Sequence, residues 1–150
     1  MTLSLFLHVL SVVVWVGGMF FAYMALRPVA ASVLEPPQRL TLWAGVFGKF
    51  FPWVWAAVAL ILLTGLHMLM VFGGAAAPLY ALAMLVLGVL MMLIFAHVFF
   101  APYKKLKRAV VAQDWKEGGA ALGQIRQLIG INLSLGLLTI AVVFLGRAFA

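Results

Sequence analysis

The stretch Leu3–Leu26, LSLFLHVLSVVVWVGGMFFAYMAL, decides the class of this protein, because it runs without a single charged side chain. About 20 apolar residues are enough for an α-helix to cross the hydrocarbon core of a bilayer. Three more such runs follow at residues 50–72, 78–101 and 128–149. The chain is 67% hydrophobic and 9% charged, with a mean hydropathy of +1.23, which excludes a water-soluble globule and a disordered chain. We therefore expect one transmembrane domain covering residues 1–150.

The four runs predict an all-α fold, an integral membrane four-helix bundle with antiparallel up-down topology. In lipid every backbone N–H and C=O must be bonded internally, so a run of this kind must be a helix. Met1–Phe6 lacks the basic residues that begin a cleaved signal, and we expect the first run to be retained and to close at Arg27-Pro28. The chain has no cysteine, which excludes disulfides, thiolate metal sites, thiol catalysis and iron–sulfur clusters.

The basic residues predict how the bundle is oriented. Nine of the ten Lys and Arg side chains fall in the connections 27–49 and 102–127, and only Arg147 lies elsewhere. Because positively charged loops stay on the cytoplasmic side, we expect both connections inside and both termini outside. In a bacterium this describes a multi-pass protein of the inner membrane with periplasmic termini. The formal charge of +7 is explained by this orientation, and we expect no nucleic-acid partner.

Both cytoplasmic connections contain patterns typical of helices. In the first, Glu35-Pro36-Pro37-Gln38 precedes apolar residues at helical spacing, namely Leu40, Trp43, Phe47 and Phe50. This pattern predicts a short amphipathic helix at the membrane interface. In the second, Asp114 and Glu117 have the spacing of a capping box, so the last helix is expected to begin near Trp115 and to project into the cytosol. The cluster Lys104–Arg108 is either a topology anchor or a site for anionic lipid headgroups.

Histidines are the main candidates for chemistry, because the centres of the spans carry no Asp, Glu, Lys or Arg. An imidazole in hydrocarbon is costly unless it is hydrogen-bonded or metal-bound. His8 and His67 should both lie ~7 Å below the outer boundary, on neighbouring antiparallel helices. Two imidazoles so placed can be the axial ligands of a b-type haem (heme b), with Trp15 and Gly18 on the face of His8 beside the ring. Alternatively, each imidazole reaches headgroups or water.

A third histidine, His97, is expected near the inner end of the third span, roughly 20 Å in depth from the other two. With Met24 it could ligate a second haem, whose propionate would pair with Arg27 or Lys49. It could equally form a hydrogen bond with Asn132 and connect two helices.

The segment His67-Met68-Leu69-Met70 indicates a second chemistry. Imidazole and thioether donors suit Cu(I), and Met70 lies three residues from His67 on one helix face. His8 could supply a third ligand at that depth. The alternative is that Met70, like the other methionines of the chain, only fills space between helices.

Three segments resemble known families. LHVL at 7–10 followed by WVGGMFF at 15–21 resembles the first helix of the copper-resistance D (CopD) domain group and of HemJ-type protoporphyrinogen oxidases. FFPWVW at 50–55 and HVFFAPY at 97–103 are similar to later segments of small stand-alone members of the copper-resistance group. The first resemblance implies a multi-span inner-membrane protein associated with copper uptake, and the HemJ resemblance implies b-type haem and protoporphyrinogen oxidation. The positions that correspond are His8, Trp15, Gly17, Gly18 and His97, whereas His67 is not matched to either pattern.

The leading hypothesis is a copper-resistance-D-like protein that binds b-type haem through His8 with His67 or His97, for electron transfer or haem handling. Copper import through His8, His67 and Met70 is the alternative. A third possibility is a non-catalytic accessory subunit whose basic inner face docks on a larger complex. No catalytic residue is predicted, and any enzymatic activity would be that of a haem-dependent oxidoreductase. The expected partners are the lipid bilayer and a second copy or a larger membrane complex.

Overall fold

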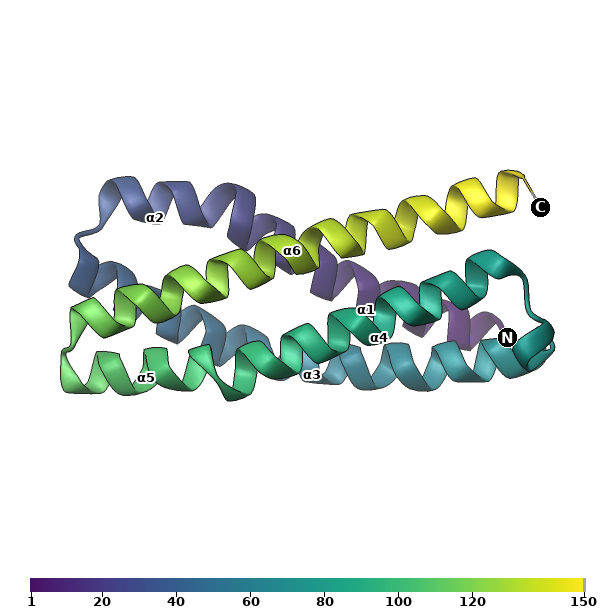
Figure 1. Cartoon of the computed structure of the whole chain (residues 1–150), viewed down its shortest axis with the longest axis horizontal. Helices are drawn as coiled ribbons and strands as arrows, with labels where there is room; N and C mark the ends of the chain where they lie inside the picture. The colour runs from purple at the N-terminus through teal and green to yellow at the C-terminus, as the bar shows by residue number, and fades with distance from the viewer. Residues whose placement is uncertain (150) are drawn as a thin grey trace.

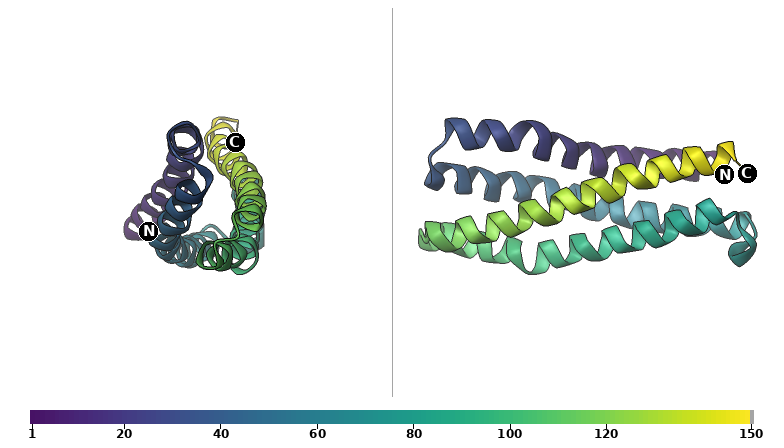
Figure 2. Two further views of the ribbon diagram at one scale, coloured as in Figure 1. Left: turned by 90° about the vertical axis from the view of Figure 1, so that its left-hand side faces the viewer. Right: turned by 45° about the horizontal axis from the view of Figure 1, so that its top comes forward.

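The computed structural model of the chain describes residues 1–149, whose regular structure is all helical. Four helical rods, each long and apolar enough to cross a membrane, make up the molecule (Figure 1); they are Thr2–Val33, Pro36–Val71, Leu79–Ala112 and Trp115–Ala148. The chain is therefore a multi-pass membrane protein, as its composition predicts. Figure 2 shows both termini at one end, which we call the terminal end. The turns at residues 34–35 and 113–114 lie at the opposite end, which we call the basic end.

The first rod continues past the point where the sequence predicts its end. It consists of α1 (Thr2–Phe21), a π-helical turn η1 (Ala22–Leu26) and α2 (Arg27–Val33). Pro28 has no N–H and cannot take a normal place within an α-helix. The wider π-helical turn just before it lets the helix continue through the proline instead of closing at Arg27-Pro28. The chain turns only at Leu34 and Glu35, whose backbones are extended.

The second rod is one continuous helix, α3 (Pro36–Val71). The expected short amphipathic helix is not a separate element, because its residues form the first part of α3. Leu40, Trp43 and Phe47 are buried in the core of the protein. Their apolar face is thus covered by other helices of the chain, and tertiary packing lets α3 run on without a break.

The last two rods turn at well-defined backbone signals. Gly73, with φ of +101°, leads into the short helix η2 (Gly74–Ala76), and α4 (Leu79–Phe100) follows. Ala101 breaks the third rod before α5 (Pro102–Ala112), and left-handed Gln113 ends it. The Asp114 carboxylate then accepts a hydrogen bond from the backbone N–H of Glu117 at 3.1 Å and caps α6 (Trp115–Ala148). The predicted cap and the predicted start of the last helix near Trp115 are both confirmed.

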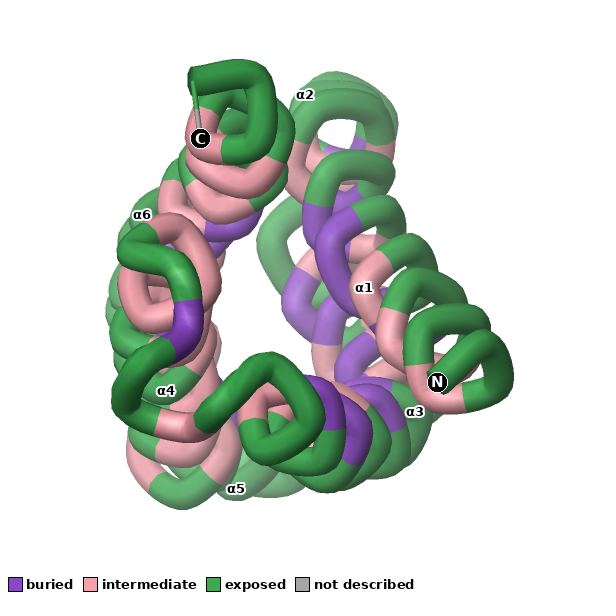
Figure 3. The backbone as a smooth tube through the Cα atoms, turned by 90° about the vertical axis from the view of Figure 1, so that its right-hand side faces the viewer, coloured by how far each residue is buried: buried purple, intermediate pink, exposed green. Residues whose placement is uncertain are grey.

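The helices pack as two pairs joined by an aromatic core. Helix α1 lies along α3, and α6 lies along α4 and α5. Figure 3 shows that buried segments face the inside of this arrangement and exposed segments face outward. Between the pairs, the Phe51 ring contacts Phe95 and Tyr103 at centroid distances of 5.3 and 4.9 Å and stacks on Phe47 at 5.0 Å. These rings connect α3 to α4 and α5.

At Gly136, helix α6 lies close to both α1 and α4. A Cβ at Gly136 would lie 3.0 Å from Val16 Cγ2 on α1 and 3.2 Å from Met91 Cε on α4. Small residues allow such close approach between membrane helices.

We expect Gly136→Leu to lower the free energy of unfolding by about 1–3 kcal/mol, because overpacking pushes α6 away from both neighbours. Gly88→Leu on α4 is the matched control, since a Cβ at Gly88 meets nothing within 4 Å. Unfolding of the purified protein in mixed detergent, followed by circular dichroism, measures both. An equal loss in the two variants would contradict the close contact at Gly136.

Candidate functional site

Two histidines lie in the interface between α1 and α3, near the terminal end. Nδ1 of His8 is 3.0 Å from the Thr64 hydroxyl, and Nδ1 of His67 is 3.0 Å from the Ser4 hydroxyl. Each histidine is therefore bonded to a hydroxyl on the opposite helix. Because residue 4 faces residue 67 and residue 8 faces residue 64, the helices are antiparallel. The two imidazoles lie about one helical turn, roughly 5 Å, apart along the axis.

The hydrogen-bonding of Thr64 fixes which nitrogen of His8 carries the proton. The Thr64 hydroxyl has one hydrogen, and it donates that hydrogen to the backbone carbonyl of Leu60. It can therefore only accept from His8, so Nδ1 of His8 is protonated. The Nε2 lone pair of the neutral ring then has no hydrogen-bond partner within residues 1–149 and can accept a hydrogen bond or bind a metal ion. A metal-binding histidine is commonly oriented in this way by an acceptor behind its other nitrogen.

Gly65 provides the space in which the His8 ring lies. A Cβ at position 65 would be 3.3 Å from His8 Cε1, tighter than an ordinary contact. Sequence reasoning missed Ser4 and Gly65. A signal was present, because each helix carries a hydroxyl followed about one turn later by a histidine, so that antiparallel packing places each hydroxyl opposite a histidine.

The other residues expected near these histidines have separate surroundings. Trp15 is buried and packs edge-on against Phe95 at 6.2 Å, within the aromatic core. It lies about 10 Å below His8 along α1. Gly18, one turn further, lies against the ring of Phe50 on α3, so a side chain and not a cofactor occupies its open face. Met70 is 70% exposed and His67 is also exposed, so the thioether of Met70 is not used as core packing.

The expected hydrogen bond between His97 and Asn132 is not present. The Asn132 amide donates to the backbone carbonyl of Met91 at 3.2 Å, about 9 Å along α4 from His97. His97 and Met24 are both exposed, and so is Lys49. Arg27 does not reach a histidine; it donates to the Tyr23 carbonyl at 3.1 Å. The proposed second haem site thus has no assembled ligand pair.

The described residues assemble neither a cluster of metal-ligating side chains nor a haem pocket. Within residues 1–149, no group of three or more His, Cys, Asp or Glu side chains could hold a metal. A haem with two axial histidines needs a flat space between the two rings, whereas His8 and His67 each bond directly to a hydroxyl on the opposite helix. One cavity of about 330 Å³ lies at the basic end and another of about 30 Å³ lies in the core, and neither is lined by histidine. The geometry gives no support for haem binding.

The sequence of these helices matches a known family over more than half of the chain. A family model described as copper resistance protein D (CopD) matches residues 44–145, from within α3 into α6. The match includes His67 and His97, whereas α1 with His8 lies outside it. No curated protein and no solved structure matches the chain. Because the family model covers more than half of the sequence, the chain belongs to the copper resistance protein D (CopD) family.

Proposed function

We propose that this protein handles copper, taking up Cu(I) between α1 and α3 through His8 and His67. The observation that carries the proposal is the orientation of His8, whose Nδ1–H donates to Thr64 and whose Nε2 is left as a free donor atom. Imidazole nitrogen is a good ligand for copper, and Cu(I) accepts few ligands in flexible geometry. His67 lies one turn away as the second donor, and the exposed Met70 thioether is the third. Membership of a family named for copper resistance supports this choice.

The same residues serve copper better than b-type haem. A Cu(I) ion bound by two imidazoles requires only that the side chains converge at the surface of the α1–α3 interface. A haem would require the two helices to separate by the thickness of the ring and would break both histidine–hydroxyl hydrogen bonds. Copper binding at this point leaves them in place. Electron transfer through a resident haem is therefore not part of the proposal.

We further propose that the terminal end faces the periplasm of a bacterium and that the basic end faces the cytoplasm. The helices have 32–36 residues and would run about 50 Å, whereas the hydrocarbon core is ~30 Å thick. Placing the spans at about 3–26, 50–72, 78–101 and 128–149 leaves nine basic residues outside the lipid, on one side. The histidine pair then lies near the outer surface, where it meets copper that arrives from outside.

Removal of one imidazole tests the copper site directly. We expect His8→Ala to abolish Cu(I) binding by purified protein in nanodiscs, measured by competition with a chromophoric Cu(I) chelator under anaerobic conditions. His97→Ala removes the same side chain from an exposed position at the other end of its span, and this control should bind Cu(I) like the wild type. Equal binding by the two variants would refute the site.

The Thr64 hydroxyl provides a second, gentler test. Thr64→Val keeps the shape of the side chain but removes the acceptor that orients His8. We expect the affinity for Cu(I) to fall about 10–100-fold, as is usual when the hydrogen-bond partner of a metal ligand is lost. A visible spectrum of the same samples separates the alternatives. A sharp b-type band in the reduced sample that disappears in His8→Ala would show that the site binds haem and not copper. If neither bound metal nor this band is found, the accessory-subunit hypothesis remains.

The orientation can be tested with single cysteines, because the natural chain has none. We expect Ala76→Cys, in the short η2 turn, to react with a membrane-impermeant maleimide in cells whose outer membrane has been made permeable. Lys105→Cys on α5 should react only after the inner membrane is broken. The reverse pattern would place the termini in the cytoplasm and the histidine pair on the inner side.

A further inference from the structure

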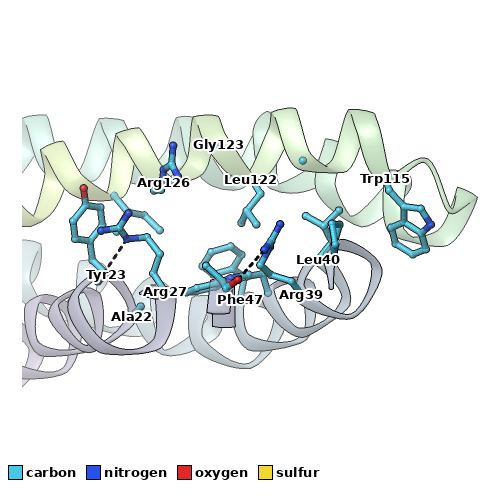
Figure 4. A pocket seen from close by; sticks show the side chains of 15 residues that line it. Ala22, Tyr23, Arg27, Arg39, Leu40, Phe47, Trp115, Leu122, Gly123 and Arg126 are labelled. Carbon is cyan, nitrogen blue, oxygen red and sulfur yellow. Dashed lines mark hydrogen bonds between the residues drawn. The ribbon is translucent and has the colours of Figure 1, made fainter. Parts of the chain in front are cut away.

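A cavity of about 330 Å³ lies at the basic end, far from the histidine pair. It is lined by three segments, namely η1 with α2, the first turns of α3 that follow them in the chain, and the distant first half of α6. Each segment contributes one arginine, and these are Arg27, Arg39 and Arg126. Figure 4 shows Arg27 and Arg39 extending toward α6, which carries Arg126. We call this space the arginine cavity.

The π-helical turn holds Arg27 in place. The backbone N–H of Arg27 bonds to the carbonyl of Ala22, five residues back, and Pro28 has no N–H to offer. The Tyr23 carbonyl therefore lacks both of its usual backbone donors, and the Arg27 Nε–H donates to it instead at 3.1 Å. The guanidinium lies over the Tyr23 ring at 4.3 Å. Its plane is thus fixed while its two terminal nitrogens have no hydrogen-bond partner among residues 1–149. Short π-helical turns of this kind frequently occur at functional sites.

The other two guanidinium groups are also available to a ligand. Arg39 Nη1 makes one long contact of 3.4 Å to the Ala31 carbonyl at the end of α2, which leaves most of its donors free. Arg126 is exposed at the rim, and no hydrogen bond to it is formed by any residue that the structure describes. Two of the three arginines are half-buried, where the attraction between charges is less screened than in bulk water.

No acidic side chain balances these charges in the cavity. The chain has three acidic residues, Glu35, Asp114 and Glu117, and none of them lines it. The Asp114 carboxylate is already used to cap α6. Three cations that line one cavity without a counter-charge favour an anionic ligand. The floor is apolar, because Leu40, Trp43 and Phe47 are 2–5% exposed. The ligand should therefore carry both an anionic group and an apolar part.

We propose that the arginine cavity binds the phosphate group of an anionic amphiphile, with the glycerol or acyl part lying against Trp43 and Phe47. Arginine is the preferred partner for phosphate because its planar fork donates two parallel hydrogen bonds. A volume near 330 Å³ accommodates a headgroup and the start of its chains. The cavity is lined by Arg27, which directly follows the first expected span, so a phospholipid of the leaflet at the basic end is the nearest source. This site is independent of the proposed copper site.

The cavity differs from the lysine cluster on α5. Lys104 and Lys107 are exposed and lie over the rings of Phe100 and Tyr103 at 5.2 and 4.7 Å. They form an open surface with no enclosing wall. Arg108, exposed on the same helix, does not line the arginine cavity and so offers a charge-matched control.

Tryptophan fluorescence can follow the binding, since Trp43 and Trp115 both line the cavity. Purified protein in neutral detergent is titrated with short-chain phosphatidylglycerol, and we expect a saturable change. Arg39→Gln and Arg126→Gln should each raise the Kd about tenfold or more, because each removes a charge-assisted hydrogen bond to phosphate. Arg108→Gln should leave the Kd unchanged. Arg126 is exposed and makes no hydrogen bond within residues 1–149, and thermal melts test whether each variant is folded.

Titrations with other ligands identify the source of the phosphate group. Short-chain phosphatidylcholine should bind at least about tenfold more weakly, because its headgroup has no net negative charge. In a further titration, inorganic phosphate replaces the lipid. If it saturates the fluorescence change, depends on the same arginines and is not displaced by phosphatidylglycerol, the cavity belongs to a soluble phosphate compound. Equal Kd values for the two lipids, or an equal loss in Arg108→Gln, would overturn the proposal.

Discussion

The constraint on which this structure depends is that each helix is longer than a membrane is thick. A helix rises about 1.5 Å per residue, so rods of 32–36 residues exceed a ~30 Å hydrocarbon core by roughly 20 Å. Guanidinium and ammonium groups enter hydrocarbon only at a large cost in free energy. The extra helix length therefore lies at the end that carries the basic residues. At that end the rods stay helical and pack on one another instead of ending in loops. The arginine cavity exists because α2, α3 and α6 all extend there.

What the sequence could predict is what local chemistry determines. Long apolar runs must be helices in lipid, and the Asp114–Glu117 cap needs only residues three positions apart, so the four candidate spans and the start of α6 were both predictable. The course of residues 27–49 was not. Pro28 and the charged residues around Pro36 favour a helix end and a separate short helix. The structure instead uses a π-helical turn before Pro28 and buries Leu40 under helices that come much later in the chain.

The candidate sites depend on how each helix is rotated about its axis, which a single sequence does not specify. The depths of His8 and His67 in the membrane suggest that they are neighbours. A depth can be predicted from sequence because every helix rises by the same distance per residue. Their bonds to Thr64 and Ser4 depend on rotation, and so does the failure of Asn132 to meet His97. The arginine cavity is harder still, because its charges come from three segments and become a site only when all three are packed together.

The aromatic core separates the two ends and limits what copper handling can mean for this chain. Phe51 is held between Phe95 and Tyr103 at centroid distances of 5.3 and 4.9 Å, and buried Trp15 packs against Phe95 from the α1 side. An ion moving from the histidine pair toward the basic end would have to displace these rings and give up its imidazole ligands in a medium that does not solvate charge. The one buried polar atom of this region that lacks a partner within residues 1–149 is Asn132 Oδ1, beside a cavity of about 30 Å³ that holds little more than a water molecule. Under the proposed copper function, capture and hand-over of Cu(I) at the terminal end therefore suit this chain better than permeation through its centre.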